Sequence, residues 1–225
     1  MIALDIFTLH GKVSGMESNW AAEHLQTIRT LMERSAIYRR ALAPIMLFAG
    51  ALGVVAAASG LLFRLDSMRA FGSLWLGTAA VVVVGALLIT RQQALKDKEP
   101  FWSPPTRRVA QALLPPLFAG MFLGMVFTML PGGGPVDFTF LLPFLWALFY
   151  GLALQAAGFF MPRGVKWFGW IYIGSACAVL CFFTVAQPDL DFNLSAHWLM
   201  GFFFGILHLA YGVYLYLTEK RGNET

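Results

Sequence analysis

The chain has 225 residues, of which 58% are hydrophobic and only 12% are charged, and its mean hydropathy is +0.67. Soluble domains carry about 25% charged residues, and a domain of this length leaves roughly 30% of its surface exposed to solvent, so the composition excludes a soluble globular protein and makes the lipid bilayer the solvent. The net charge of +4 is explained without a nucleic-acid partner, because membrane proteins collect Lys and Arg in the loops on one side of the bilayer.

The first residues of the chain lack the marks of a secretory signal peptide. Residues 1–15 have no basic start, no long apolar core and no small-residue cleavage site. We expect residues 1–18 to form a flexible lead-in. Translation from Met16 is an alternative, because the helical pattern begins just after this residue.

Residues 19–40 are predicted to form an amphipathic, basic helix on the cytoplasmic side of the membrane. Asn19 is a candidate N-cap, three apolar residues recur at helical spacing, and three arginines near the end of the segment favour anionic lipid. The apolar residues are Leu25, Ile28 and Met32, and the arginines are Arg34, Arg39 and Arg40. Two interpretations stay open: the helix lies along the lipid headgroups and leads into the first span, or it docks on a protein partner or a second copy of the chain.

Six stretches without Asp, Glu, Lys or Arg follow, each about twenty residues long or slightly longer, which is the length a helix needs to cross about 30 Å of hydrocarbon. They cover residues 41–63, 70–90, 109–130, 138–161, 167–187 and 194–217. The pattern predicts an all-α integral membrane protein, with six transmembrane helices in a compact bundle over residues 41–217 and a cytoplasmic tail over residues 218–225.

The basic residues predict the orientation of this bundle. Fourteen of the sixteen Lys and Arg residues fall on one side of the alternating spans, and only Arg64 and Arg69 fall on the other. The side rich in Lys and Arg is the cytoplasmic side, so we expect both termini in the cytoplasm. No other address signal is visible, and the plasma (cell inner) membrane is the expected location.

The last predicted span carries the main candidate functional residues. They are His197, Gly201, Gly205, His208 and Gly212, at spacings of 4, 4, 3 and 4 that place them on one face of an α-helix. Small residues at this spacing let a neighbouring helix approach closely, so one interpretation is a packing seam with each imidazole hydrogen-bonded across it. Gln155, which continues a stripe of small residues in the fourth span, is a candidate for a second seam. His208 is a candidate functional residue in its own right, because a polar group near mid-bilayer is costly unless paired.

Two cysteines in the fifth span raise the question of a metal. Cys177 and Cys181 lie one helical turn apart, and the depth of Cys177 in the bilayer matches that of His208. Two thiols and an imidazole make a candidate soft-metal site for copper or zinc. A fourth ligand of the usual type is missing, and cysteine also packs as a small apolar residue, so we expect no metal and no other cofactor.

The sequence contains none of the catalytic motifs that we sought, which include a zinc-protease helix, a nucleophile elbow and a phosphate-binding loop. We therefore expect a non-enzymatic membrane protein that serves as an accessory, scaffold or sensory subunit. The alternative is a permease or channel for a small solute, using the face of the last span that carries glycine and histidine. A water-filled cavity reaching His208 favours transport, whereas a closed core favours the accessory role.

Overall fold

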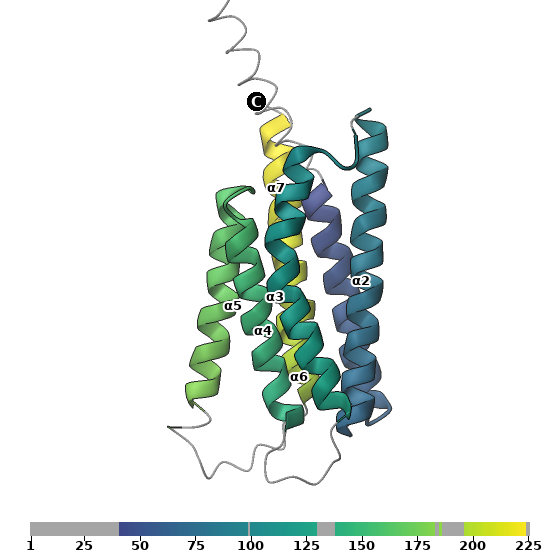
Figure 1. Cartoon of the computed structure of the whole chain (residues 1–225), viewed down its shortest axis with the longest axis vertical. Coiled ribbons are helices and arrows are strands. Elements are labelled where there is room, and N and C mark those ends of the chain that lie inside the picture. Colours follow the sequence, from purple (N-terminus) through teal and green to yellow (C-terminus); the bar gives the residue numbers. More distant parts are fainter. Residues whose placement is uncertain (1–40, 99, 130–137, 183–184, 186–195, 224–225) are drawn as a thin grey trace, which may run out of the picture. The chain divides into compact units, whose positions relative to one another are not determined.

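The structure of the chain, a computed structural model, describes residues 41–98, 100–129, 138–182, 185 and 196–223. The predicted lead-in at 1–18 and the predicted amphipathic helix at 19–40 lie outside these residues. Six helices in the described part are long and apolar enough to cross a membrane, which confirms the predicted all-α, six-span fold class (Figure 1). In chain order they are the first span Ala41–Leu62, α2 (Met68–Lys96), α3 (Pro104–Met129), α4 (Phe138–Ala157), α5 (Arg163–Cys181) and a last span made of α6 (Ala196–Met200), a π-helical turn η2 (Gly201–Ile206) and α7 (Leu207–Asn223).

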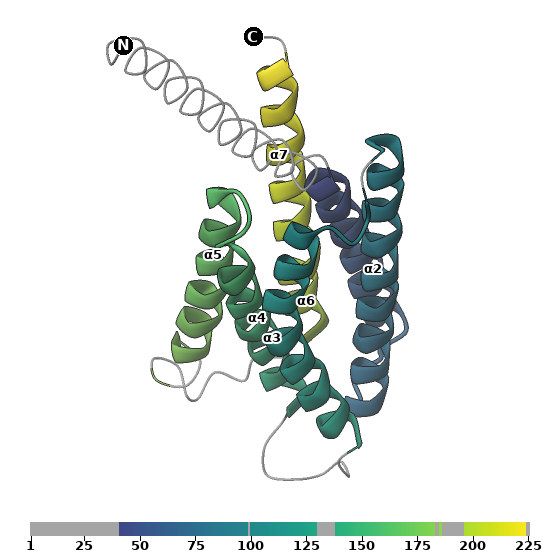
Figure 2. The same ribbon diagram turned by 45° about the horizontal axis from the view of Figure 1, so that its top comes forward.

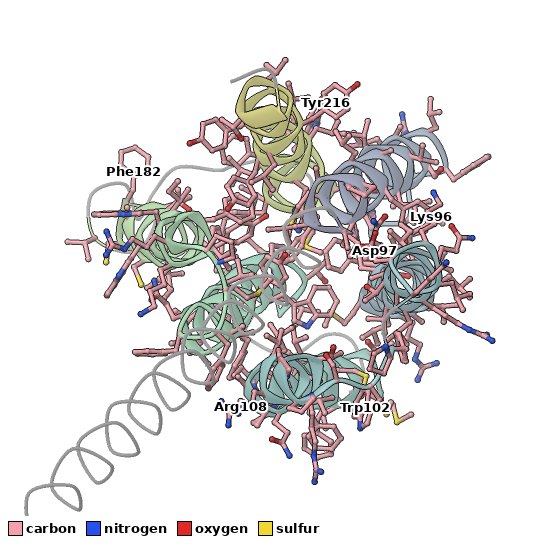
Figure 3. The ribbon with its side chains drawn as sticks, turned by 90° about the horizontal axis from the view of Figure 1, so that it is seen from above. Lys96, Asp97, Trp102, Arg108, Phe182 and Tyr216 are labelled. Carbon is pink, nitrogen blue, oxygen red and sulfur yellow. The ribbon has the colours of Figure 1, made fainter. Side chains whose placement is uncertain are left out.

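From α2 to α5, helices that follow one another in the chain pack side by side. α2 packs against α3, α3 against α4 and α4 against α5, and Figure 2 shows α4 and α5 as a hairpin. The first and last spans also lie side by side, because Gly50 and Gly53 of the first span closely approach Gly205 of the last (Figure 3). The two spans that are farthest apart in the sequence thus share one interface.

Two clusters of buried side chains form the core. One cluster includes Phe144 of α4, Tyr172 of α5 and Phe203 of η2, while the other includes Phe71 of α2 together with residues of the first span, α4 and the last span. Phe204 packs against both clusters. The middle of the last span therefore joins the two halves of the core.

The outer surface of the bundle is rich in large apolar side chains. Trp102, Phe182 and Tyr216 point outwards in Figure 3 and are 59%, 49% and 59% exposed. α2 and α3 carry exposed apolar residues along much of their lengths. Soluble monomers rarely expose so much apolar surface, whereas helices that face lipid do.

The connection between α2 and α3 is shorter than predicted. α2 continues to Lys96, past the predicted end at 90, and α3 begins at Pro104, ahead of the predicted start at 109. Ser103 starts α3: its hydroxyl lies 2.9 Å from that of Thr106, and its carbonyl accepts the Arg107 N–H at 3.0 Å. The predicted spans end where the uncharged stretches end. The helices are longer, because their backbone hydrogen bonds continue through the charged residues on either side.

The turn between α4 and α5 has the predicted length of five residues but lies four residues earlier in the chain than predicted. α4 ends at Ala157 instead of 161, and α5 begins at Arg163 instead of 167. The Gly158 N–H still donates to the Leu154 carbonyl at 2.8 Å. Pro162, which has no N–H to donate, directly precedes α5. Residues 158–162 therefore make a short turn that fixes the two helices next to each other.

Candidate functional site

The last span is not a regular α-helix. Six residues, Gly201–Ile206, form the π-helical turn η2, and the N–H of Leu207 donates to the Phe202 carbonyl, five residues back. A regular helix bonds to the residue four back, so everything after η2 is rotated relative to α6. The predicted shared face holds for the three glycines, which all contact the first span, and for His197, which lies against Gly60 of the same span, but not for His208, which reaches α4 and α5.

The glycines of the first and last spans meet as a closed seam, which we call the glycine seam: Gly50 and Gly53 of the first span with Gly201, Gly205 and Gly212 of the last. A Cβ atom on Gly53 would collide with the Phe204 carbonyl group, and one on Gly50 would lie 2.7 Å from the Leu209 nitrogen. These obstacles are backbone atoms, which cannot rotate away. The two helices therefore approach at a distance that only glycine allows.

The sequence analysis missed the glycines of the first span. Gly50, Gly53 and Gly60 are spaced three and seven residues apart with Ala57 between them, and this spacing of small residues is the same signal that singled out the last span. Comparing all six spans for such stripes would have identified both sides of the seam.

His208 is buried, with 3% of its surface exposed, and protein groups contact both nitrogens of its ring. Nε2 lies 2.8 Å from the hydroxyl of Tyr150 in α4, and Nδ1 lies 2.8 Å from the hydroxyl of Tyr172 in α5 and 3.3 Å from the Phe203 carbonyl. The Tyr172 hydroxyl also donates to the Phe203 carbonyl. Four groups from α4, α5 and the last span thus form one buried network, which we call the His208 network.

The direction of each hydrogen bond in the His208 network follows from the donors. Because the single proton of the Tyr172 hydroxyl goes to the Phe203 carbonyl, the Tyr172 oxygen accepts from His208 Nδ1–H. Nε2 then carries no proton and accepts from the Tyr150 hydroxyl. In this arrangement every donor has an acceptor with the imidazole neutral, as buried polar groups require.

His197, at the start of the last span, is fully buried in a separate place. The indole N–H of Trp75 donates to its Nδ1 at 3.1 Å, so Nε2 carries the proton and donates to the Leu65 carbonyl at 3.2 Å. Phe71 packs on the ring with centroids 5.0 Å apart, and a Cβ on Gly60 would collide with it. His197 therefore ties the last span to α2 and to the turn between the first span and α2.

Replacing Trp75 with phenylalanine is expected to lower the free energy of unfolding by about 1 kcal/mol or somewhat more, because Nδ1 of His197 loses its donor in a buried place. Trp198→Phe is the matched control, since Trp198 is 59% exposed. Thermal unfolding of both variants in detergent measures the difference. Equal melting temperatures for the two variants would contradict a structural role for this hydrogen bond.

The other predicted site residues lie elsewhere. Gln155 donates to the Lys166 carbonyl at 2.7 Å, which joins α4 to the start of α5. Cys177 and Cys181 are exposed, and the fifth span contributes Tyr172 to the His208 network instead. Tyr172 and Cys177 are five positions apart in the sequence, so their side chains lie on different faces of α5. In the described residues, no three His, Cys, Asp or Glu side chains gather in a way that could hold a metal ion.

The residues predicted to contact lipid or a partner lie outside the described part of the chain. They are Leu25, Ile28, Met32, Arg34, Arg39 and Arg40. Their predicted role stays a prediction.

The site that the described residues do build is a buried contact between helices, with one histidine on each side of η2. Comparisons of the chain with protein-family models, with curated proteins and with solved structures found no match.

Proposed function

We propose that this six-span helical membrane protein acts without catalysis, as an accessory, scaffold or sensory subunit of the membrane. The observation that supports the proposal is that the polar groups of the His208 network hydrogen-bond one another. Both ring nitrogens of His208 are occupied by Tyr150, Tyr172 and the Phe203 carbonyl. A residue that binds a solute through hydrogen bonds needs a free hydrogen-bonding position, and His208 offers none in this arrangement.

The packing of the glycine seam is evidence against the alternative of a permease or channel. Such a pathway would use the glycine face of the last span, but that face is filled by the backbone of the first span. A Cβ on Gly205 would lie 2.9 Å from a methyl carbon of Val54 and 3.1 Å from its nitrogen. The seam supports close packing of helices rather than a route for solute.

The contact to partners is proposed to lie in residues 19–40. Deleting residues 1–36 is expected to leave an inserted bundle that no longer associates with its partner or with a second copy. Arg34→Gln/Arg39→Gln/Arg40→Gln is the companion variant, because it keeps the length of the segment and removes only the charge. Crosslinking in native membranes followed by size analysis measures association. Undiminished association of the shortened chain would contradict the role assigned to this segment.

Flux measurements separate the accessory role from transport. Liposomes that contain the full chain are expected to swell in gradients of small neutral solutes no faster than empty liposomes. Faster swelling that disappears in His208→Gln, a variant expected to fold, would support the permease instead.

We also propose that both termini lie in the cytoplasm, with the bundle in the plasma membrane. The support is the uneven distribution of Lys and Arg between the two sides of the spans. Single cysteines introduced at Gly133 and at Asn223 are expected to react with an impermeant thiol reagent from opposite sides of the membrane. Cys177 and Cys181 must first be replaced by serine, because both thiols are exposed. Labelling of both positions from the outside would overturn the orientation.

A further inference from the structure

Two basic side chains at the start of α5, next to the turn from α4, have no carboxylate partner among the described residues. Arg163 is exposed, and the ammonium group of Lys166 lies 3.6 Å from the centre of the Phe159 ring. Neither residue forms an ion pair with any Asp or Glu in the part of the chain that the structure describes. The charge at this turn is therefore available to a partner from outside the protein.

Lys166 is held in place by the hairpin itself. Its carbonyl accepts the Gln155 side-chain amide at 2.7 Å, and its aliphatic stem packs so closely over Gly158 that a Cβ there would collide with it. The aromatic ring of Phe159 then positions its ammonium group. Because these contacts fix the side chain, an anion that binds here needs to order less of the protein.

The first turn of α5 adds to the positive charge of this pair. It contains no acidic residue and has no side-chain cap, so nothing within the turn offsets the positive end of the helix dipole at the same place.

The surroundings indicate the depth of this turn in the membrane. Trp167 and Phe159 are 72% and 75% exposed, and Phe160 is 47% exposed. Exposed aromatic residues beside basic ones are typical of the level of the lipid headgroups. An anion found at this depth, next to an apolar helix surface, belongs to a lipid.

We propose that the α4–α5 hairpin binds the headgroup of an anionic phospholipid. The phosphate lies between Arg163 and Lys166, which are three positions apart on α5 and therefore neighbours on its surface, while the acyl chains run along the exposed face of α5. This site is separate from the arginines at 34–40 and from the partner contact proposed above.

The test compares the full chain in nanodiscs of phosphatidylcholine alone and of phosphatidylcholine mixed with phosphatidylglycerol. Native mass spectrometry measures retained phosphatidylglycerol, and thermal unfolding measures stability. Arg163→Gln/Lys166→Gln is expected to bind the anionic lipid roughly ten- to thirty-fold more weakly. Arg107→Gln/Arg108→Gln is the matched control, because it removes the same charge from exposed positions near the start of α3, and it is expected to retain the lipid.

Each other outcome overturns the proposal. Equal lipid loss in the two double variants would show a general effect of surface charge, and unchanged retention in Arg163→Gln/Lys166→Gln would show no site. Inorganic phosphate that stabilises the lipid-free protein as strongly as phosphatidylglycerol would replace the lipid by a soluble anion. Thermal unfolding in phosphatidylcholine alone identifies a double variant that fails to fold. In that case the single substitution Arg163→Gln, at an exposed position, decides in its place.

Discussion

Gly53→Leu is expected to destabilise the bundle by about 3 kcal/mol or more, at the upper end of the cost of overpacking a core. The reason is the absence of any space beside Gly53, where a Cβ would collide with the carbonyl group of Phe204 in η2. The two helices must separate along the glycine seam to accept a side chain. Thermal unfolding in detergent, followed by loss of the folded monomer on size exclusion, measures the effect.

Gly174→Leu is the control for this substitution. Gly174 lies in α5 and is exposed, and a Cβ there would have no neighbour within 4 Å. Both substitutions remove a glycine from a helix and gain about 1 kcal/mol of helix propensity, so their difference isolates the packing term. A Gly53→Leu protein as stable as Gly174→Leu would contradict the closed seam.

His208→Leu is expected to cost about 1–3 kcal/mol, because the buried Tyr150 hydroxyl loses its acceptor and Tyr172 loses a donor. His208→Gln is expected to cost less, since an amide offers both a donor and an acceptor. The measurement is again thermal unfolding in detergent.

A double-mutant cycle tests the individual hydrogen bond to Tyr150. Tyr150→Phe alone leaves Nε2 of His208 without a donor, whereas Tyr150→Phe combined with His208→Leu removes both partners. The combined loss is therefore expected to be smaller than the sum of the two single losses, by about 1 kcal/mol. Strictly additive losses would mean that the two side chains do not depend on each other.

The spans could be predicted from the sequence because charged residues are absent from them. Their ends could not, because the helical hydrogen bonds of α2 and α3 continue into charged segments up to Lys96 and back to Pro104. Hydropathy indicates which residues can lie in the hydrocarbon layer, but it does not indicate where the hydrogen bonding of a helix ends.

The candidate site was predicted in part. Glycine spacing indicated a packing seam, and the glycines of the last span do lie against the first span; depth indicated that the fifth span meets His208. The contacts of His208 could not be predicted, because spacing within one helix does not show which neighbouring helices surround each side chain. For the same reason, depth alone suggested Cys177 where the structure places Tyr172.

The pairing of the first span with the last has a consequence for how the protein is made. Gly53 leaves the ribosome about 150 residues before Gly205, which at translation speeds of roughly 5–20 residues per second is about 8–30 s. During this interval the glycine face of the first span lacks the helix that covers it in the finished bundle. A chaperone or protease in the membrane that recognises exposed glycine faces would therefore act on unfinished chains and spare completed ones.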